Sequence, residues 1–182
     1  MSSLIEPLFF DTDCLSAFLW VNGQSILAKL YPARIIIPAE VYAEISNPTI
    51  QHLKDKVDTM ISCGDVRIES IVVDTNEYRL YRKLTTTPEW GHKIIGRGEA
   101  AAIALAKEQG GIIASNNLKD IAIYVEEYNL KHKTTGVILR EALEASLITE
   151  ADGNQLWAAM LKKRRKLGFD TFTEYLQLTR PG

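Results

Sequence analysis

The chain has 182 residues, of which 46% are hydrophobic and 24% are charged, as in an ordinary globular protein of one domain. Its net charge of -2 argues against a protein that coats DNA or RNA, but not against an enzyme with a local basic patch. The first seven residues do not resemble a signal peptide, and no apolar run approaches the length of a membrane span. We therefore expect a cytoplasmic protein whose two cysteines, Cys14 and Cys63, are reduced.

Short apolar runs that alternate with helical patterns predict an α/β fold with a mainly parallel sheet. Strands are expected at residues 8–10, 34–37 and 112–114, and a longer extended segment at 66–73. Helices are expected after Asp11 up to a break at Asn22-Gly23, around 26–30, from Pro38 to the break at Asn47-Pro48, and at 49–62, 75–84, 99–108, 118–128, 134–146 and 150–167. Residues 85–98 are expected to form a loop.

Acidic and amide side chains recur where the predicted strands end, which is the edge where open parallel sheets bind their ligands. They are Asp11 and Asp13 after the first strand, Glu44 in the helix after the second, Glu99 at the start of the alanine-rich helix, and Asn116, Asn117 and Asp120 after the strand at 112–114. Hard oxygen ligands of this kind suit Mg²⁺ or Mn²⁺. A divalent cation would also neutralise the repulsion between crowded carboxylates.

Each acid has an ordinary structural explanation when it is taken alone. Asp11 can cap a helix, and Glu44 can be a solvated helix residue. Glu99 and Asp120 can favour their helix N-termini through the helix dipole. It is their shared position at one sheet edge that favours a metal site.

Four segments resemble the motifs of the PIN-domain superfamily. Phe9 to Leu15, an apolar strand followed by Asp-Thr-Asp and an aliphatic residue, resembles the opening motif. Residues 38–45 resemble the second motif, whose last glutamate is Glu44, and residues 96–106, from Gly-Arg-Gly-Glu onward, are similar to the third and are the most specific. Residues 112–117 match the fourth in position, but asparagines stand where PIN domains usually carry aspartate.

The resemblance implies a PIN-like three-layer fold in residues 1–148, with residues 149–182 as a C-terminal helical extension of the same domain. It implies an endoribonuclease that depends on Mg²⁺ or Mn²⁺, of the kind found as the toxin in VapC-like toxin–antitoxin pairs. The metal would polarise an RNA phosphodiester and lower the pKa of an attacking water. Its expected ligands and catalytic residues are Asp11, Glu44, Glu99 and Asp120, with Asn117 as a further ligand and with Asp13 and Asn116 in support.

The resemblance also suggests an RNA substrate, an antitoxin protein and a second copy of the chain as partners, and no membrane. Lys163, Arg164 and Arg165 belong to the one dense basic run, which we expect either to contact RNA phosphates or to be a solvated helix face. The two asparagines favour an alternative, a catalytically weak or inactive PIN-fold module that binds RNA or protein.

Several other patterns are set aside. Gly96-x-Gly98-x-x-Ala101 fits a relaxed dinucleotide fingerprint, but no clear strand precedes it and Glu99 would repel a pyrophosphate. Asp-Thr-Asp also resembles the start of the haloacid dehalogenase phosphatases, whose later motifs are missing here. The three histidines, at positions 52, 92 and 132, have no ligand spacing and are interpreted as surface residues; Trp90 is interpreted as a packing residue rather than as a base-stacking one.

Overall fold

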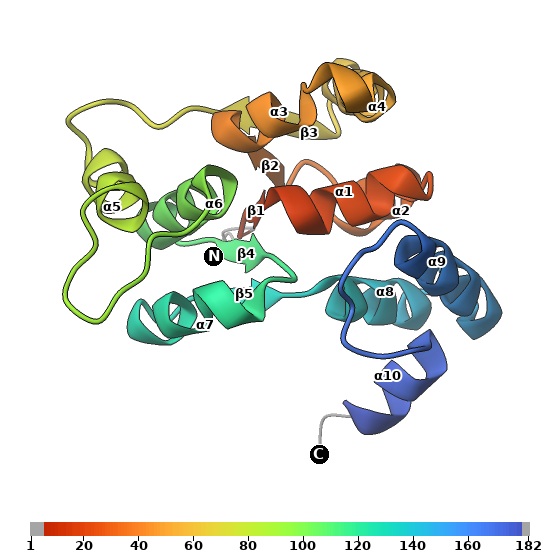
Figure 1. The fold of residues 1–182 in the computed structure, drawn as a ribbon. Helices are drawn as coiled ribbons and strands as arrows, with labels where there is room; N and C mark the ends of the chain where they lie inside the picture. The colour runs from red at the N-terminus through yellow and green to blue at the C-terminus, as the bar shows by residue number, and fades with distance from the viewer. Residues whose placement is uncertain (1–5, 180–182) are drawn as a thin grey trace, which may run out of the picture.

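The computed structural model describes residues 6–179, and its centre is a five-stranded sheet in which every pair of neighbouring strands is parallel. The strands are β1 (Leu8–Phe10), β2 (Ile35–Pro38), β3 (Val66–Glu69), β4 (Ile112–Ala114) and β5 (Lys131–Lys133). Their order across the sheet is β3-β2-β1-β4-β5, so the chain builds outward from β1 on one side and then crosses to the other (Figure 1). The predicted parallel α/β fold is confirmed.

Alternate residues of the strands face two separate cores, as the two-residue period of a strand requires. Leu8 and Phe10 belong to one core and Phe9 to the other. In β2, Ile35 and Ile37 likewise face the first core and Ile36 the second. Because both faces are covered, these strands are continuous apolar runs, which is why the sequence predicts them. The result is three layers: helices, sheet, helices.

Helices α5, α6 and α7 cover one face of the sheet, on the left of Figure 1, and α1, α4, α8 and α9 lie on the other side. Their bounds are α1 Thr12–Trp20, α2 Gln24–Leu30, α3 Ala39–Ile45, a 3₁₀ turn Pro48–Ile50, α4 Gln51–Ser62, α5 Asn76–Thr85, α6 Arg97–Gln109, α7 Leu118–Glu127, α8 Thr135–Glu144, α9 Glu150–Lys162 and α10 Phe172–Leu178. Within residues 6–179, none of the helices has the length and apolar character needed to cross a bilayer.

The C-terminal helices pack into the core that contains Leu8 and Phe10 of β1. Trp157 of α9 and Phe172 of α10 are buried there, with their ring centroids 5.8 Å apart. A Cβ at Gly153 would come within 2.3 Å of the Phe172 ring, so glycine allows α10 to lie close against α9. The boundary of the PIN-like unit at residue 148 stays a prediction.

The end of α9 differs from the sequence-based expectation of a helix over 150–167, because the helix stops at Lys162. Arg164 has a left-handed backbone with φ of 59°, and the Arg165 N–H donates to the Met160 carbonyl at 3.1 Å. The chain then turns back, and the Trp157 indole donates to the Phe169 carbonyl at 2.9 Å. The basic run is therefore a loop, and its interpretation as a helix face is wrong.

Smaller differences concern edge strands and side chains. Only residues 66–69 of the extended segment form a strand, and β5 was not predicted because its Lys-His-Lys sequence is polar. His132 lies half-buried in β5, with Nε2 2.9 Å from the Ser115 carbonyl oxygen, so its interpretation as a surface residue is wrong. Trp90 is fully exposed, so its interpretation as a packing residue is wrong as well.

Candidate active site

The centre of the site is Asp11, which follows β1 and is completely buried. Its Oδ1 accepts the Cys14 N–H at 2.7 Å, so Asp11 caps helix α1, as one of its two interpretations predicts. Its Oδ2 is buried without a hydrogen-bond partner among the described residues. Burial raises the pKa of Asp11 to about 7; the Ser115 side chain and the Cys14 N–H oppose this shift, and the nearby Asp13 and Glu99 carboxylates add to it.

Glu44 and Glu99 are each held by a backbone N–H as well. Glu44 Oε1 accepts from the Gly98 N–H at 3.0 Å, and its Oε2 accepts from the Thr12 hydroxyl. Glu99 Oε2 accepts from the Gly96 N–H at 3.3 Å. Thus Asp11, Glu44 and Glu99, three of the four predicted acids, each have one oxygen fixed by the main chain, which orients the carboxylates without neutralising their charge.

Gly98 lets helix α6 approach these acids closely. A Cβ at this position would lie 2.8 Å from the Thr12 hydroxyl oxygen and 2.9 Å from Glu44 Oε2, both too short for ordinary contact. Glycine is thus required by the close approach of α6 to Glu44, and not by a turn. The sequence motif contains Gly98, but only the structure shows what the residue does.

Asn117 links Glu99 to Asp120. Its side-chain amide donates to Glu99 Oε1 at 2.6 Å and to Asp120 Oδ2 at 2.8 Å. Burial raises the pKa of Glu99; the Asn117 and Gly96 hydrogen bonds lower it, and the charges of Asp120 and Glu44 raise it. The structure therefore brings two of the predicted carboxylates and one of the predicted amides together at the start of α7.

Asn116 has a different environment from Asn117. Its amide nitrogen donates to the Thr135 hydroxyl at 2.8 Å, and its Oδ1 accepts the Thr135 N–H at 2.8 Å. Both ends of the amide are thus used to join the end of β4 to the start of α8. Asn116 therefore supports the site by fixing the strand end rather than by offering a free ligand atom.

Two adjoining cavities contain these residues. One, of about 260 Å³, is lined by Asp11, Thr12, Asp13, Ser16, Glu44, Gly96, Gly98, Glu99 and Arg165. The other, of about 470 Å³, is lined by Asp13, Glu99, Asn116, Asn117, Lys119, Asp120, Arg164, Arg165 and Lys166. Asp13, Glu99 and Arg165 are shared by the two, so the predicted acids border one continuous region.

Cations of the α9–α10 loop also line the larger cavity, and we call them, together with Lys119, the cationic wall. The Arg165 guanidinium donates to Asp13 Oδ1 at 3.0 Å and to the Ser16 hydroxyl at 3.2 Å. Arg164 lines the same cavity, but Lys163 does not, because its ammonium lies 4.8 Å from the centre of the Trp20 ring in a different groove. Lys119 of α7 and Lys166 also line this cavity. Lys166 belongs to the dense basic run of the sequence, whereas Lys119 was not singled out, because its proximity to the acids arises only in the fold.

A separate group of side chains with metal-ligand chemistry lies away from these cavities. In the described part of the chain, one ligand atom each of Glu89, His92 and Glu127 come within 4.8 Å of one another. His92 Nε2 lies 2.7 Å from a Glu127 oxygen, and Glu89 is paired with Lys83. These side chains thus already have protein partners, although sequence spacing gave no indication that they would meet.

The fold and the cavities define an α/β protein in which carboxylates and cations line adjoining cavities at the switch point of a parallel sheet. A family model described as DUF3368, PIN domain, matches residues 8–180. The chain therefore belongs to the PIN-domain family, whose members are generally nucleases. No curated protein and no solved structure matches it. The predicted superfamily is confirmed, and the VapC-like subtype stays a prediction.

Proposed function

We propose that this chain is a divalent-metal-dependent endoribonuclease that hydrolyses RNA phosphodiester bonds. The observation that carries the proposal is Asp11 Oδ2, a completely buried carboxylate oxygen that has no hydrogen-bond partner within residues 6–179. Buried polar atoms are rarely left without a partner, and those that are call for an explanation such as a bound ion. Asp13 and Glu99 raise the pKa of Asp11 further, so a cation would relieve repulsion there.

The residues present fit Mg²⁺ or Mn²⁺. Asp11, Glu44 and Glu99 would hold the ion, with Asn117 or Asp120 completing the set; all are oxygen donors, which hard cations prefer. When bound, such an ion polarises a phosphodiester and generates a nucleophilic hydroxide from water near neutral pH. The N–H groups of Cys14, Gly98 and Gly96 keep the three carboxylates in place before the ion arrives.

The cationic wall supports an RNA substrate. Arg164, Arg165, Lys166 and Lys119 border the cavity that also contains Glu99 and Asp120. An RNA phosphate held by these cations would place the neighbouring phosphodiester of the RNA beside the acids. Arg165 is tied to Asp13, so Asp13 would position this guanidinium rather than bind the ion directly. A role as a toxin, with an antitoxin protein as partner, is part of this proposal.

The second candidate is a catalytically weak or inactive PIN-fold protein that binds RNA or another protein. Asn117 favours it, because its amide donates to both Glu99 and Asp120 and so satisfies oxygens that an ion would otherwise occupy. An amide ligand also carries no net charge, which lowers affinity for a divalent cation. Asp120 offsets this by adding a carboxylate three residues after Asn117.

Cleavage of mixed RNAs with Mn²⁺ or Mg²⁺, with and without EDTA, separates the two candidates. We expect cleavage that EDTA abolishes and that Asp11→Asn reduces about a hundredfold, since a charged ligand is replaced by a neutral one. Glu126→Gln is the matched control, because Glu126 is an exposed acid of α7 outside both cavities. Cleavage that survives EDTA would refute the metal mechanism. No cleavage, together with no Mn²⁺ binding in calorimetry, would establish the second candidate.

A further inference from the structure

Arg97, the first residue of helix α6, stands between the two glycines that line the smaller cavity. Its side chain is exposed, and its Nε donates to the Tyr81 hydroxyl of α5 at 3.1 Å. This contact raises the pKa of Arg97, and the charges of Glu40 and Glu44 on α3 add to the shift. Even so, Arg97 forms no ion pair with any side chain of residues 6–179. It is an anchored cation beside the acids that no direct contact neutralises.

Local helix physics does not explain a cation at this position. The first turn of an α-helix favours acids, because its main-chain N–H groups carry a partial positive charge. Arg97 also has donors to spare: a guanidinium carries N–H groups on each of its nitrogens, and only Nε has an acceptor in the described part of the chain. The terminal nitrogens form the flat fork that binds phosphate oxygens in pairs. Both facts favour an anionic ligand at Arg97 that does not come from these residues.

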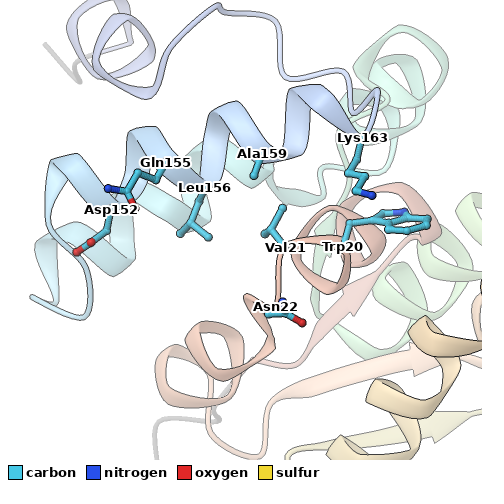
Figure 2. Close-up of a pocket in the computed structure, with 8 residues that line it drawn as sticks. All are labelled: Trp20, Val21, Asn22, Asp152, Gln155, Leu156, Ala159 and Lys163. Carbon is cyan, nitrogen blue, oxygen red and sulfur yellow. The ribbon is translucent and has the colours of Figure 1, made fainter.

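Arg97 lies on the far side of the acids from the cationic wall. Tyr81 ties it to α5, and α6 lies between α5 and α1 (Figure 1). The wall includes Arg165, which is tied to α1 instead. Lys163 of the same basic run does not extend the wall, since it lies beside Trp20 in the groove between α1 and α9 (Figure 2). Cations thus border the acids on two sides, and the smaller cavity reaches from Arg165 to the glycines on either side of Arg97.

We propose that Arg97 binds an RNA phosphate on one side of the cleaved bond, while the cationic wall binds a phosphate on the other side. This role rests on the proposed function and specifies its substrate more closely, as an RNA strand that continues past the acids in both directions. Contacts on both sides hold the phosphodiester over the acids, whereas a strand held on one side only is free to swing away. A terminal nucleotide would reach only one of the two phosphate sites.

Tyr81 is a positioning residue in this arrangement. Its hydroxyl holds Nε and so directs the terminal nitrogens of Arg97. Tyr81→Phe keeps the ring and removes the hydroxyl, so it should weaken RNA binding by about threefold, less than the loss of Arg97 itself. A protein with both Tyr81→Phe and Arg97→Gln should bind RNA no more weakly than Arg97→Gln alone, because both changes act on the same contact.

The test is RNA binding without cleavage. Every protein carries Asp11→Asn and is kept in EDTA, and fluorescence anisotropy follows a labelled single-stranded RNA of mixed sequence and about fifteen nucleotides. Arg97→Gln should weaken binding about tenfold and lower the slope of log K on log salt by about 0.7, because one phosphate contact is lost. Arg97→Lys should keep the slope, since the charge remains, but weaken binding about threefold, since the fork is lost. Arg79→Gln is the matched control, at an exposed arginine of α5 that lines a different cavity, and it should change neither quantity.

Cleavage with Mn²⁺ by proteins that keep Asp11 gives a second readout. Arg97→Gln should raise KM and leave kcat nearly unchanged, because its contact is made away from the reacting phosphorus. If Arg97→Gln does not fold by circular dichroism, Arg97→Lys and Tyr81→Phe replace it, and unchanged RNA binding by both would overturn the role of Arg97.

The outcomes separate this role from the proposed function. If the Asp11→Asn protein binds the RNA and Arg97→Gln binds it equally well with the same salt slope, Arg97 only offsets the charges of Glu40 and Glu44. Its role as a phosphate ligand is then overturned, while the proposed function stands. If the Asp11→Asn protein binds no RNA at all, the proposed function is wrong, and the role of Arg97 is overturned with it.

Discussion

Replacing Asp11 by Asn should stabilise the metal-free protein, and the gain should grow with pH. Burial raises the pKa of Asp11 from 3.8 to about 7, so the folded state favours the protonated carboxyl. The stability that the protonated Asp11 carboxyl gives to the folded state is fully present below pH 3.8. It is lost as the pH rises to about 7, because the folded state must then bury a charged carboxylate. At about 1.4 kcal/mol per pH unit, this corresponds to an upper bound of about 4 kcal/mol above neutral pH.

Urea denaturation in EDTA at pH values from about 5 to 8 measures the effect. The free energy of unfolding of the parent should fall by up to about 3 kcal/mol over this range on account of Asp11, and that of Asp11→Asn should lack this component. The amide keeps the volume and the cap of α1. Asp13→Asn is the control, because Asp13 is partly exposed and paired with Arg165, and its loss should change stability by at most about 1 kcal/mol. If the free energy of unfolding changes with pH in the same way for the parent and for Asp11→Asn, burial of the Asp11 charge does not lower stability and the reasoning is wrong.

Three further predictions concern the same site. Gly98→Ala should lower stability by about 1–3 kcal/mol in thermal or urea unfolding, because its Cβ would lie 2.9 Å from Glu44 Oε2; an unchanged midpoint would contradict this. Arg165→Gln should weaken RNA binding and lower the slope of log K on log salt by about 0.7, and an equal slope would remove Arg165 from the phosphate contacts. Asn117→Asp should tighten Mn²⁺ binding in calorimetry and Asp120→Ala should loosen it, whereas unchanged affinities would exclude both as ligands.

The central strands could be predicted from the sequence because they are covered on both faces. Residues 8–10 and 112–114 match β1 and β4, and β2 differs from its prediction by one residue at each end. The edge strands have weaker signals: β5 consists of Lys131, His132 and Lys133, and main-chain pairing with β4 rather than hydrophobic pattern holds it. The end of α9 depends on packing of residues after it, including Phe169 and Phe172, which no local pattern of residues 150–167 reveals.

The acids of the site could be predicted because topology brings strand ends together whatever the side chains do. Their partners could not. Asn116 and Asn117 are adjacent, yet one amide is used up by Thr135 and the other faces Glu99 and Asp120. The direction of a side chain after a strand end depends on the backbone dihedral angles there, and residue type does not determine those angles.

The cationic wall would allow a chain with a net charge of -2 to bind the proposed polyanionic substrate. Charges of both signs meet at these cavities: acids come from the strand ends, and Arg164 and Arg165 from a loop some 150 residues later than Asp13. An arginine side chain without a fixed partner would move toward the nearest acid and cancel the negative charge that the proposed metal ion needs. The Arg165 pair with Asp13 directs that cation to a partly exposed carboxylate and leaves buried Asp11 without an ion pair among the described residues. Under the proposed function, this arrangement would leave the other acids for a metal ion and the arginines for a phosphate, although they border adjoining cavities.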